Sequence, residues 1–284
     1  MSQILDGQMI SKEIRERIKE EVNRLEVKPK LVVILVGDDD ASKIYVRNKI
    51  KACETVGIAT EDYILPKDTR EKELVDLIEK LNKNKEVNGI LVQLPLPKHL
   101  NEDTIVNTIS PIKDVDGLNM VNQGKLLNRK PVLVPATPKG IITLLKRYFV
   151  EIEGKRVVIV GRSKLVGMPL ALLFNHANAT VTVCHSYTED LKDITKQADI
   201  LVSAVGKADF IRGDMIKKDA VVVDVGINRQ MGHIVGDVNF KEAMEVARLV
   251  TPVPKGVGPM TIASLLENVL ECYDLQKCDM KWNE

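Results

Sequence analysis

Short, continuous apolar runs rich in valine and isoleucine recur along this chain, separated by segments with helical periodicity. Residues 30–36 and 157–160 are the clearest of these runs, and residues 88–94 are predicted to form another buried strand. A strand that is apolar throughout, rather than on alternate residues, is buried on both faces, which is typical of a parallel sheet covered by helices. The alternation of such strands with helices therefore predicts a layered α/β fold.

The first half of the chain is predicted to form a three-layer α/β domain. Gly57 is expected to stop the second of its helices, and Thr69 is expected to cap the third. Pro95 and Pro97 break the last strand. The expected strands are 30–36, 60–65 and 88–94, and the expected helices are 11–25, 41–56 and 69–82.

A second α/β series follows residues 135–138, where Thr137 is expected to cap a helix that begins at Pro138. Its strands are expected near 155–160, 179–184, 199–204 and 220–225, and its helices near 167–176, 189–197 and 212–217. The last helix, from Met260 to about Tyr273, is expected to pack back on the first domain. The predicted domains are residues 1–137 plus 260–284, and residues 138–259.

Composition restricts the classes of function. The 284 residues carry 41 basic and 40 acidic side chains, a net charge of +1, whereas a nucleic-acid-binding protein usually has a basic surplus. The four cysteines, Cys53, Cys184, Cys272 and Cys278, have no metal-ligand spacing, so we expect reduced thiols and no metal. The start of the chain does not resemble a signal peptide, and no apolar run is long enough for a membrane helix. These patterns predict a cytoplasmic protein that does not bind membranes.

The strongest nucleotide-binding signal is the turn after the strand at 157–160. Gly161 and Gly167 permit a tight turn and close helix packing, although Ser163 replaces the second glycine of the usual dinucleotide fingerprint. In a Rossmann layout Arg162 and Ser186 would face the adenosine ribose, where cationic and hydroxyl side chains suit a 2′-phosphate. The pattern favours NADP over NAD. A plain strand–helix turn with a solvated arginine is the alternative.

Candidate catalytic residues lie in the first domain. Ser42, Tyr45 and Lys49 share one face of a predicted helix, and Gln93 stands where a parallel strand ends. A lysine moves protons well only where desolvation favours its neutral form. In the alternative interpretation, Lys49 is a solvated helix residue and Gln93 only makes a contact in a loop at the end of the strand.

Two turns complete the set of candidates. Asp116 precedes Gly117 in a turn that holds two acids, and in the alternative interpretation its carboxylate bonds only to its own backbone. Residues 251–261 form a rigid segment, rich in proline and glycine, before the last helix. Such a segment faces substrate in many enzymes, but a structural linker has the same composition.

Together these segments resemble the bifunctional methylenetetrahydrofolate dehydrogenase/methenyltetrahydrofolate cyclohydrolase family over essentially the whole chain. The segments that carry the resemblance are S-x-x-Y-V-x-x-K at 42–49, GILVQLPLP at 89–97, KDVDG at 113–117, GRS-x-x-VG-x-P at 161–169, CHS at 184–186 and TPVP at 251–254. The family oxidises 5,10-methylenetetrahydrofolate with NADP and hydrolyses the methenyl product to 10-formyltetrahydrofolate. It is typically a homodimer joined through the cofactor domains.

The resemblance implies a role for each candidate residue. Lys49 is expected to handle the proton chemistry, and Gln93 is expected to tune that chemistry. Tyr45 is expected to line the aromatic part of the folate, and Asp116 is expected to hold the pterin. Pro254 and Lys255 are expected to contact the substrate. The expected cofactor-binding residues are Gly161, Arg162, Ser163, Val166, Gly167, Ser186 and Ile227.

Lys255 departs from the family pattern, in which a glycine is usual at this position. Its side chain either narrows the folate pocket or adds a cation for the glutamate tail. The backbone at this position is expected to adopt a conformation open to non-glycine residues.

Other classes of protein share parts of the pattern. Y-x-x-x-K at 45–49 also occurs in short-chain dehydrogenases, but there it follows the cofactor turn in the chain, whereas here it precedes it. A two-domain reductase of the shikimate dehydrogenase type has the same domain order as this chain. An NADP-binding protein without catalysis would need no Lys49.

Overall fold

The computed structural model describes residues 3–230 and 232–277, which fold into two compact units. We call Glu13–Ala136 with Leu265–Glu284 the N-terminal unit, and Met1–Lys12 with Thr137–Ser264 the C-terminal unit. Three helices contribute to both units, namely α1 (Gly7–Arg24), α6 (Ala136–Arg147) and α10 (Val257–Lys277).

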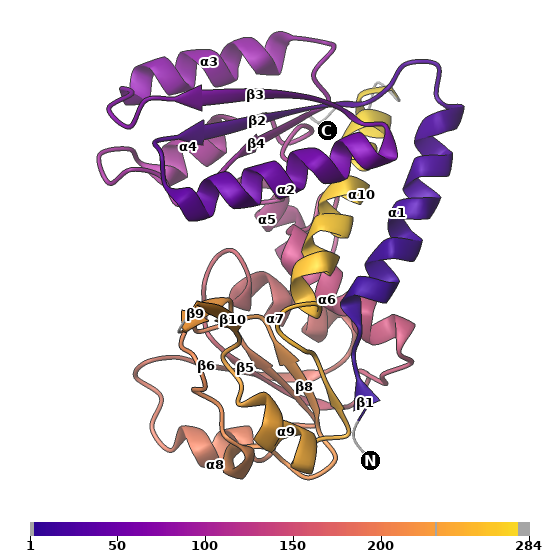
Figure 1. Ribbon diagram of the computed structural model, residues 1–284, viewed down its shortest axis with the longest axis vertical. Coiled ribbons are helices and arrows are strands. Elements are labelled where there is room, and N and C mark those ends of the chain that lie inside the picture. The colour runs from indigo at the N-terminus through magenta and orange to yellow at the C-terminus, as the bar shows by residue number, and fades with distance from the viewer. Residues whose placement is uncertain (1–2, 231, 278–284) are drawn as a thin grey trace. The chain divides into compact units, whose positions relative to one another are not determined.

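The N-terminal unit is built on a three-stranded parallel sheet in the order β3-β2-β4. Helix α2 lies along one face of the sheet and α3 along the other, which gives the predicted three layers (Figure 1). Alternate residues of β2, Val32, Ile34 and Val36, pack with α3 and α4 in one buried cluster. The elements are β2 (Lys30–Val36), α2 (Asp40–Val56), β3 (Ala59–Leu65), α3 (Glu71–Lys83), β4 (Gly89–Val92), α4 (Glu102–Thr108) and α5 (Met120–Leu127).

Helix α2 is capped at both ends by local chemistry. The Asp39 carboxylate accepts a hydrogen bond from the Ser42 backbone N–H at 2.7 Å. At the other end Gly57 takes a left-handed conformation, with φ at +84°, and donates its N–H to carbonyls of the last turn. The predicted stop at Gly57 is thus confirmed.

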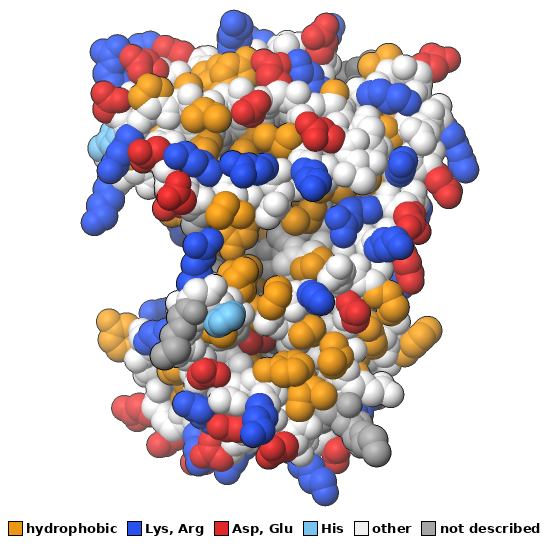
Figure 2. Space-filling model, viewed as in Figure 1, with side chains coloured by type: hydrophobic (Ala, Val, Ile, Leu, Met, Phe, Trp, Pro, Cys, Tyr) orange, Lys and Arg blue, Asp and Glu red, His pale blue; other side chains and the backbone are white. Residues whose placement is uncertain are grey.

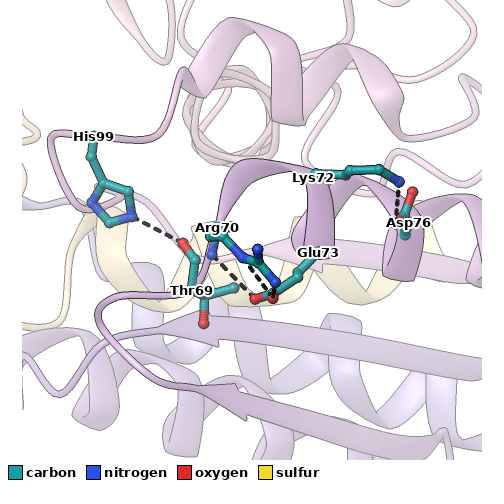
Figure 3. A network of polar contacts seen from close by, with 6 residues as sticks. All are labelled: Thr69, Arg70, Lys72, Glu73, Asp76 and His99. Atoms are coloured by element: carbon teal, nitrogen blue, oxygen red, sulfur yellow. Dashed lines mark hydrogen bonds and ion pairs between the residues drawn. The ribbon is translucent and has the colours of Figure 1, made fainter.

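The start of α3 differs from the prediction, because Thr69 does not cap it. The Thr69 hydroxyl donates instead to the Pro66 carbonyl at 2.7 Å. Figure 3 shows that Glu73, in the first turn, reaches back to Arg70, whose backbone N–H lies 3.3 Å from the Glu73 carboxylate. His99 contacts the Thr69 carbonyl at 2.9 Å. The acid at the third helical position therefore does the capping, so the helix begins at Glu71.

The last helix packs back on the first domain, as expected. The side-chain amide of Asn268 donates to the carbonyls of Val115 and Val134 at 2.8 and 2.9 Å. The Tyr273 hydroxyl donates to the Val27 carbonyl at 2.6 Å. These bonds join the turn at 115–117 and the segment before α6 to α10.

The C-terminal unit contains a six-stranded parallel sheet in the order β1-β11-β8-β7-β5-β6. The strand order reverses at β5, which lies between β7 and β6, and ligands of such sheets bind at the carboxyl ends of the strands at this reversal. The elements are β1 (Gln3–Ile4), β5 (Arg156–Val160), α7 (Gly167–His176), β6 (Thr180–Cys184), α8 (Leu191–Thr195), β7 (Ile200–Ser203), the 3₁₀-helix η1 (Gly213–Met215), β8 (Val221–Asp224), β9 (Asn228–Gln230), β10 (His233–Val235), α9 (Phe240–Val246) and β11 (Leu249–Val250).

Several elements of this unit differ from their predicted extent. Helix α8 starts only at Leu191, because Asp190 has a left-handed backbone with φ at +48°. Helix α6 begins at Ala136, so Thr137 lies inside its first turn, where its hydroxyl contacts that of Thr261 at 3.0 Å. The segment expected to be helical near 212–217 is a short 3₁₀-helix.

The beginning of the chain belongs to the C-terminal unit, whereas we predicted it in the first domain. Strand β1 pairs in parallel with β11, and the Leu5 N–H donates to the Val250 carbonyl at 2.9 Å. A two-residue strand has no periodicity of its own, so only its pairing reveals it.

Charges of both signs are mixed over the surface. On the face that Figure 2 shows, lysine and arginine side chains are interspersed with aspartate and glutamate. This mixture agrees with the near-zero net charge of the sequence.

Candidate active site

Lys49 and Gln93, predicted separately from the sequence, meet in the N-terminal unit. Lys49 is half-buried on α2, and its Nζ donates to the Oε1 of Gln93 at 3.1 Å. The amide of Gln93 is itself held, because its Nε2 donates to the Leu94 carbonyl at 2.6 Å and its backbone N–H donates to Ile34 of β2 at 2.9 Å. The amide oxygen therefore faces the amine in a defined orientation.

The other residues on the Lys49 face of α2 differ in how far they are buried. Tyr45, one turn before Lys49, exposes 41% of its surface, whereas Ser42 is buried at the start of α2. Cys53, one turn after Lys49, is fully buried, and burial raises the pKa of its thiol to about 12. The Tyr45 ring is thus open to a ligand, and the neighbouring thiol stays neutral.

The turn at 113–117 separates its two acids. Asp114 is buried, and its Oδ2 accepts hydrogen bonds from the Asn119 backbone N–H at 2.8 Å and from the Asn122 amide at 2.9 Å. Burial, together with the charge of Asp116, raises the pKa of Asp114 to about 6. Asp116 is half-buried, and within the described residues its carboxylate has no hydrogen-bond partner. The acid that bonds to the backbone is therefore Asp114, not Asp116.

Gly117 closes this turn for a steric reason. Its φ is +66°, and a Cβ at this position would lie 2.7 Å from the Pro135 nitrogen. Lys113, on the other side, is buried and donates to the carbonyls of Leu81 and Asn84 at the end of α3, at 3.2 and 2.7 Å. Burial lowers the pKa of Lys113 to about 8. The turn that carries Asp116 is therefore anchored on both sides.

The loop with Pro254 and Lys255 belongs to the C-terminal unit. Lys255 is exposed, and its carbonyl accepts a hydrogen bond from the Gln8 backbone N–H at 2.9 Å. Its φ is +87°, in the left-handed region that favours glycine, so the expectation of an ordinary backbone here is wrong. A non-glycine residue in this conformation costs roughly 1–2 kcal/mol.

The two glycines of the turn after β5 are required by close backbone contacts. Gly161 has φ at +121°, and a Cβ there would lie 2.3 Å from the Ala204 carbonyl oxygen. At Gly167, the first residue of α7, a Cβ would lie 2.1 Å from the Gly161 oxygen. The Ser163 hydroxyl accepts a bond from the Val166 N–H at 3.2 Å, which closes the turn.

Arg162 and Ser186 follow two strand ends that are joined by a hydrogen bond. The Gly161 N–H donates to the Cys184 carbonyl at 2.9 Å, so the turn after β5 lies beside the end of β6. Both Arg162 and Ser186 are exposed. Ile227, 48% exposed, follows β8 in the same sheet. The structure therefore brings Arg162 and Ser186 to one edge of the sheet.

Family models match both halves of the chain. Residues 5–116 match the tetrahydrofolate dehydrogenase/cyclohydrolase catalytic domain, and residues 135–277 match the NAD(P)-binding domain of the same family. The chain belongs to the tetrahydrofolate dehydrogenase/cyclohydrolase family. It is an enzyme with methylenetetrahydrofolate dehydrogenase and methenyltetrahydrofolate cyclohydrolase activities, built from a catalytic domain and a parallel-sheet NAD(P)-binding domain.

Individual members of the tetrahydrofolate dehydrogenase/cyclohydrolase family are similar along their whole length. The bifunctional protein FolD of Aquifex aeolicus is 54% identical over 278 residues, which is 96% of each chain. The crystal structure of the bifunctional enzyme FolD from Campylobacter jejuni superimposes with a TM-score of 0.93 at 46% identity and covers 96% of this chain and 99% of its own. The Trypanosoma brucei enzyme, crystallised with NADP and an inhibitor, has a TM-score of 0.92 at 38% identity, covering 96% and 97%.

The shikimate dehydrogenase alternative rests on fold alone. The enzyme from Aquifex aeolicus has a TM-score of 0.54 at 14% identity. That likeness reflects the two-domain architecture, whereas the tetrahydrofolate dehydrogenase/cyclohydrolase family matches at the level of sequence.

Two buried acids of the NAD(P)-binding domain escaped the sequence analysis. Asp224, at the end of β8, and Asp237, after β10, are 3% and 0% exposed. Asp-Val-Gly and Gly-Asp-Val, the segments in which they occur, look like ordinary turns, so no sequence signal marked them.

The cysteines that the structure describes, Cys53, Cys184 and Cys272, are buried and form no disulfide with one another. Cys278 lies outside the described residues. Across residues 3–230 and 232–277 no group of three or more His, Cys, Asp or Glu side chains is arranged to hold a metal ion. Among the helices described, none combines the length and apolar character needed to cross a bilayer.

Proposed function

We propose that Lys49 and Gln93 are the proton-handling pair of both reactions. The observation that carries this proposal is the 3.1 Å hydrogen bond from Lys49 Nζ to Gln93 Oε1. A neutral amide oxygen orients the amine without adding a negative charge that would hold it protonated. Gln93 therefore positions the amine without contributing a negative charge.

Both reactions make use of an amine at this position. When the methylene carbon of the substrate loses hydride, it becomes part of an amidinium cation, which a neutral Lys49 does not oppose. Water next attacks this cation, and Lys49 moves protons to and from the attacking water and the leaving nitrogen. Bound NADP supplies the hydride acceptor in the first reaction.

Tyr45 and Asp116 are proposed to bind and orient the folate. The exposed Tyr45 ring offers a flat apolar surface, and the carboxylate of Asp116 is free to accept bonds from pterin N–H groups. We assign Pro254 and Lys255 to the substrate side as well. We propose that the first predicted domain, residues 1–137 plus 260–284, binds folate and that residues 138–259 bind NADP. The segment before Glu13 is the exception, because it packs in the C-terminal unit.

The turn after β5 fits a dinucleotide. Its glycines permit the tight backbone packing of the turn, and in the described residues no acceptor engages the backbone N–H groups of Arg162 and Ser163, which are therefore available to a phosphate. We propose that Arg162 and Ser186 bind the 2′-phosphate of NADP, since both are exposed at the same sheet edge. Gly161, Ser163, Val166, Gly167 and Ile227 complete the proposed cofactor site.

We also propose a homodimer joined through the C-terminal units. Strand β6 is an edge strand of the six-stranded sheet, and edge strands carry unpaired backbone groups suited to pairing with a second copy. Sedimentation equilibrium tests this assembly, and a monomer at micromolar concentration contradicts it. The cytoplasmic location stays a prediction.

The function is tested by an assay of the purified protein with 5,10-methylenetetrahydrofolate, run separately with NADP and with NAD. The expected result is formation of methenyltetrahydrofolate with NADP, followed by its enzyme-accelerated hydrolysis. Absence of turnover in folded protein contradicts the proposal.

A further inference from the structure

Asp237 is a buried carboxylate that accepts five hydrogen bonds. Its Oδ2 receives the backbone N–H groups of Val205 and Gly206 at 2.7 and 3.1 Å, and the Ser203 hydroxyl at 3.3 Å. Its Oδ1 receives the Lys207 N–H at 2.9 Å and the Asn228 side-chain amide at 3.0 Å. All of these donors belong to the end of β7 and the segments after β7 and β8.

Asp224 in turn holds the backbone at Asp237 in place. Its Oδ1 accepts the backbone N–H groups of Asp237 and Gly226 at 2.9 and 3.0 Å, and its Oδ2 accepts that of Val238 at 2.9 Å. A Cβ at Gly226 would lie 2.0 Å from the Asp237 carboxylate, and one at Gly236 would lie 1.8 Å from that of Asp224. Both glycines are therefore needed to admit the two carboxylates.

This arrangement is costly as a device for stability alone. Burying a charged group carries a large desolvation penalty, and apolar side chains of similar volume often stabilise a core as well or better. Every group held by Asp237 lies at the carboxyl ends of the strands, where ligands of such sheets bind. The location points to the ligand site rather than to the core.

The held segment directly contacts the cofactor turn. Val205 follows Ala204, whose carbonyl oxygen would lie 2.3 Å from a Cβ at Gly161. The Ala204 N–H donates to the Val160 carbonyl at 2.8 Å. A shift of the segment at 204–207 would therefore move the surface against which the Gly161 turn is packed.

We propose that Asp237 is a positioning residue of the dinucleotide site. It fixes residues 205–207 and Asn228 so that the Gly161 turn keeps the shape that receives the cofactor. The inference rests on the proposed function, in which that turn holds NADP. Asp237 does not touch the reacting atoms and acts only through the segments that it holds.

The substitution Asp237→Asn tests this role. An asparagine keeps the size of the side chain but accepts on one oxygen only, and its NH₂ group faces backbone N–H donors. We expect the KM for NADP to rise by about tenfold or more, with kcat at saturating NADP within about twofold of wild type. Hydrolysis of methenyltetrahydrofolate, which needs no cofactor, should keep its wild-type rate.

Asp199→Asn is the matched control. Asp199 also caps a backbone N–H of the same unit, that of Arg156 at 2.9 Å, but it precedes β7 at the opposite end of the sheet. This variant should leave the KM for NADP unchanged.

The outcomes separate positioning from stability. An unchanged KM for NADP in folded Asp237→Asn overturns the inference, as does a parallel loss of both activities. If that variant does not fold, Ser203→Ala removes one donor and keeps the three backbone donors. The KM of this variant for NADP should then rise about two- to threefold, and an unchanged KM would contradict the positioning role of Asp237. Wild-type protein inactive with NADP overturns the proposed function and this inference together.

Discussion

The amine of Lys49 on α2 and the amide oxygen of Gln93 after β4 lie 3.1 Å apart, although 44 residues separate them in the chain. Strand β2 links the two, because α2 follows it directly and Gln93 bonds to its Ile34 carbonyl at 2.9 Å. The amine that we propose to handle protons is thereby held against an uncharged partner.

Replacing Lys49 by methionine should abolish most turnover. The variant keeps the length of the side chain but cannot carry a proton, and loss of a general acid–base group costs roughly 100- to 10,000-fold. Both activities are measured by the absorbance of methenyltetrahydrofolate. Lys51→Met, an exposed change on the same helix, is the control and should behave as wild type. Normal turnover in Lys49→Met would contradict the catalytic assignment of Lys49.

Replacing Gln93 by glutamate should slow the dehydrogenase. A carboxylate beside the amine stabilises a positively charged lysine, which opposes the cationic product. We expect about a tenfold loss of dehydrogenase turnover. Gln93→Met, which adds no charge, is the comparison. An equal loss in both variants would show that the charge at position 93 has no influence.

Arg162→Ala should weaken NADP binding selectively. If the guanidinium binds the 2′-phosphate, the KM for NADP rises by about 10- to 100-fold, while the KM for NAD stays within about twofold. NAD thus serves as the control within one protein. An equal change for both cofactors would mean that Arg162 supports the turn rather than the phosphate.

Lys255→Gly should stabilise the protein. Glycine adopts the observed φ of +87° without strain, although it gains freedom in the unfolded chain, so the free energy of unfolding should rise by up to about 1 kcal/mol. Urea unfolding measures this difference. If Lys255→Gly were less stable than wild type, the backbone at Lys255 would not be strained.

Lys255→Met removes the charge and keeps the strained backbone. If both variants have a higher KM for polyglutamylated folate, Lys255 provides a cation for the glutamate tail.

Asp224 should make stability fall as the pH rises. Burial raises the pKa of Asp224 to about 7, despite three backbone N–H bonds that favour the charged form. Because the folded-state pKa lies above the unfolded value of about 3.9, its contribution is fully present below pH 4 and is lost as the pH rises through 7. The difference in urea midpoint between wild type and Asp224→Asn, followed from pH 4.5 to 8, reports this slope. A difference independent of pH would contradict the raised pKa.

The regular elements near the candidate residues followed from local sequence. The apolar run at 30–36 can only be buried on both faces, and Gly57 is suited to the left-handed end of a helix, so β2 and α2 were predictable. The face shared by Tyr45 and Lys49 follows from helical spacing. Motif resemblance supplied the chemistry that spacing alone left open.

The sequence by itself therefore determined the α/β class and most of the longer elements, and it supplied the residues of the proposed site. Only the tertiary structure decided that β1 joins the C-terminal sheet, that Asp114 rather than Asp116 is bonded to its turn, and that Asp237 ties the segments after β7 and β8 together. These features depend on contacts between residues distant in the chain. Periodicity reports only the burial of neighbouring positions, and it carries no information about which distant backbone N–H a buried carboxylate will meet.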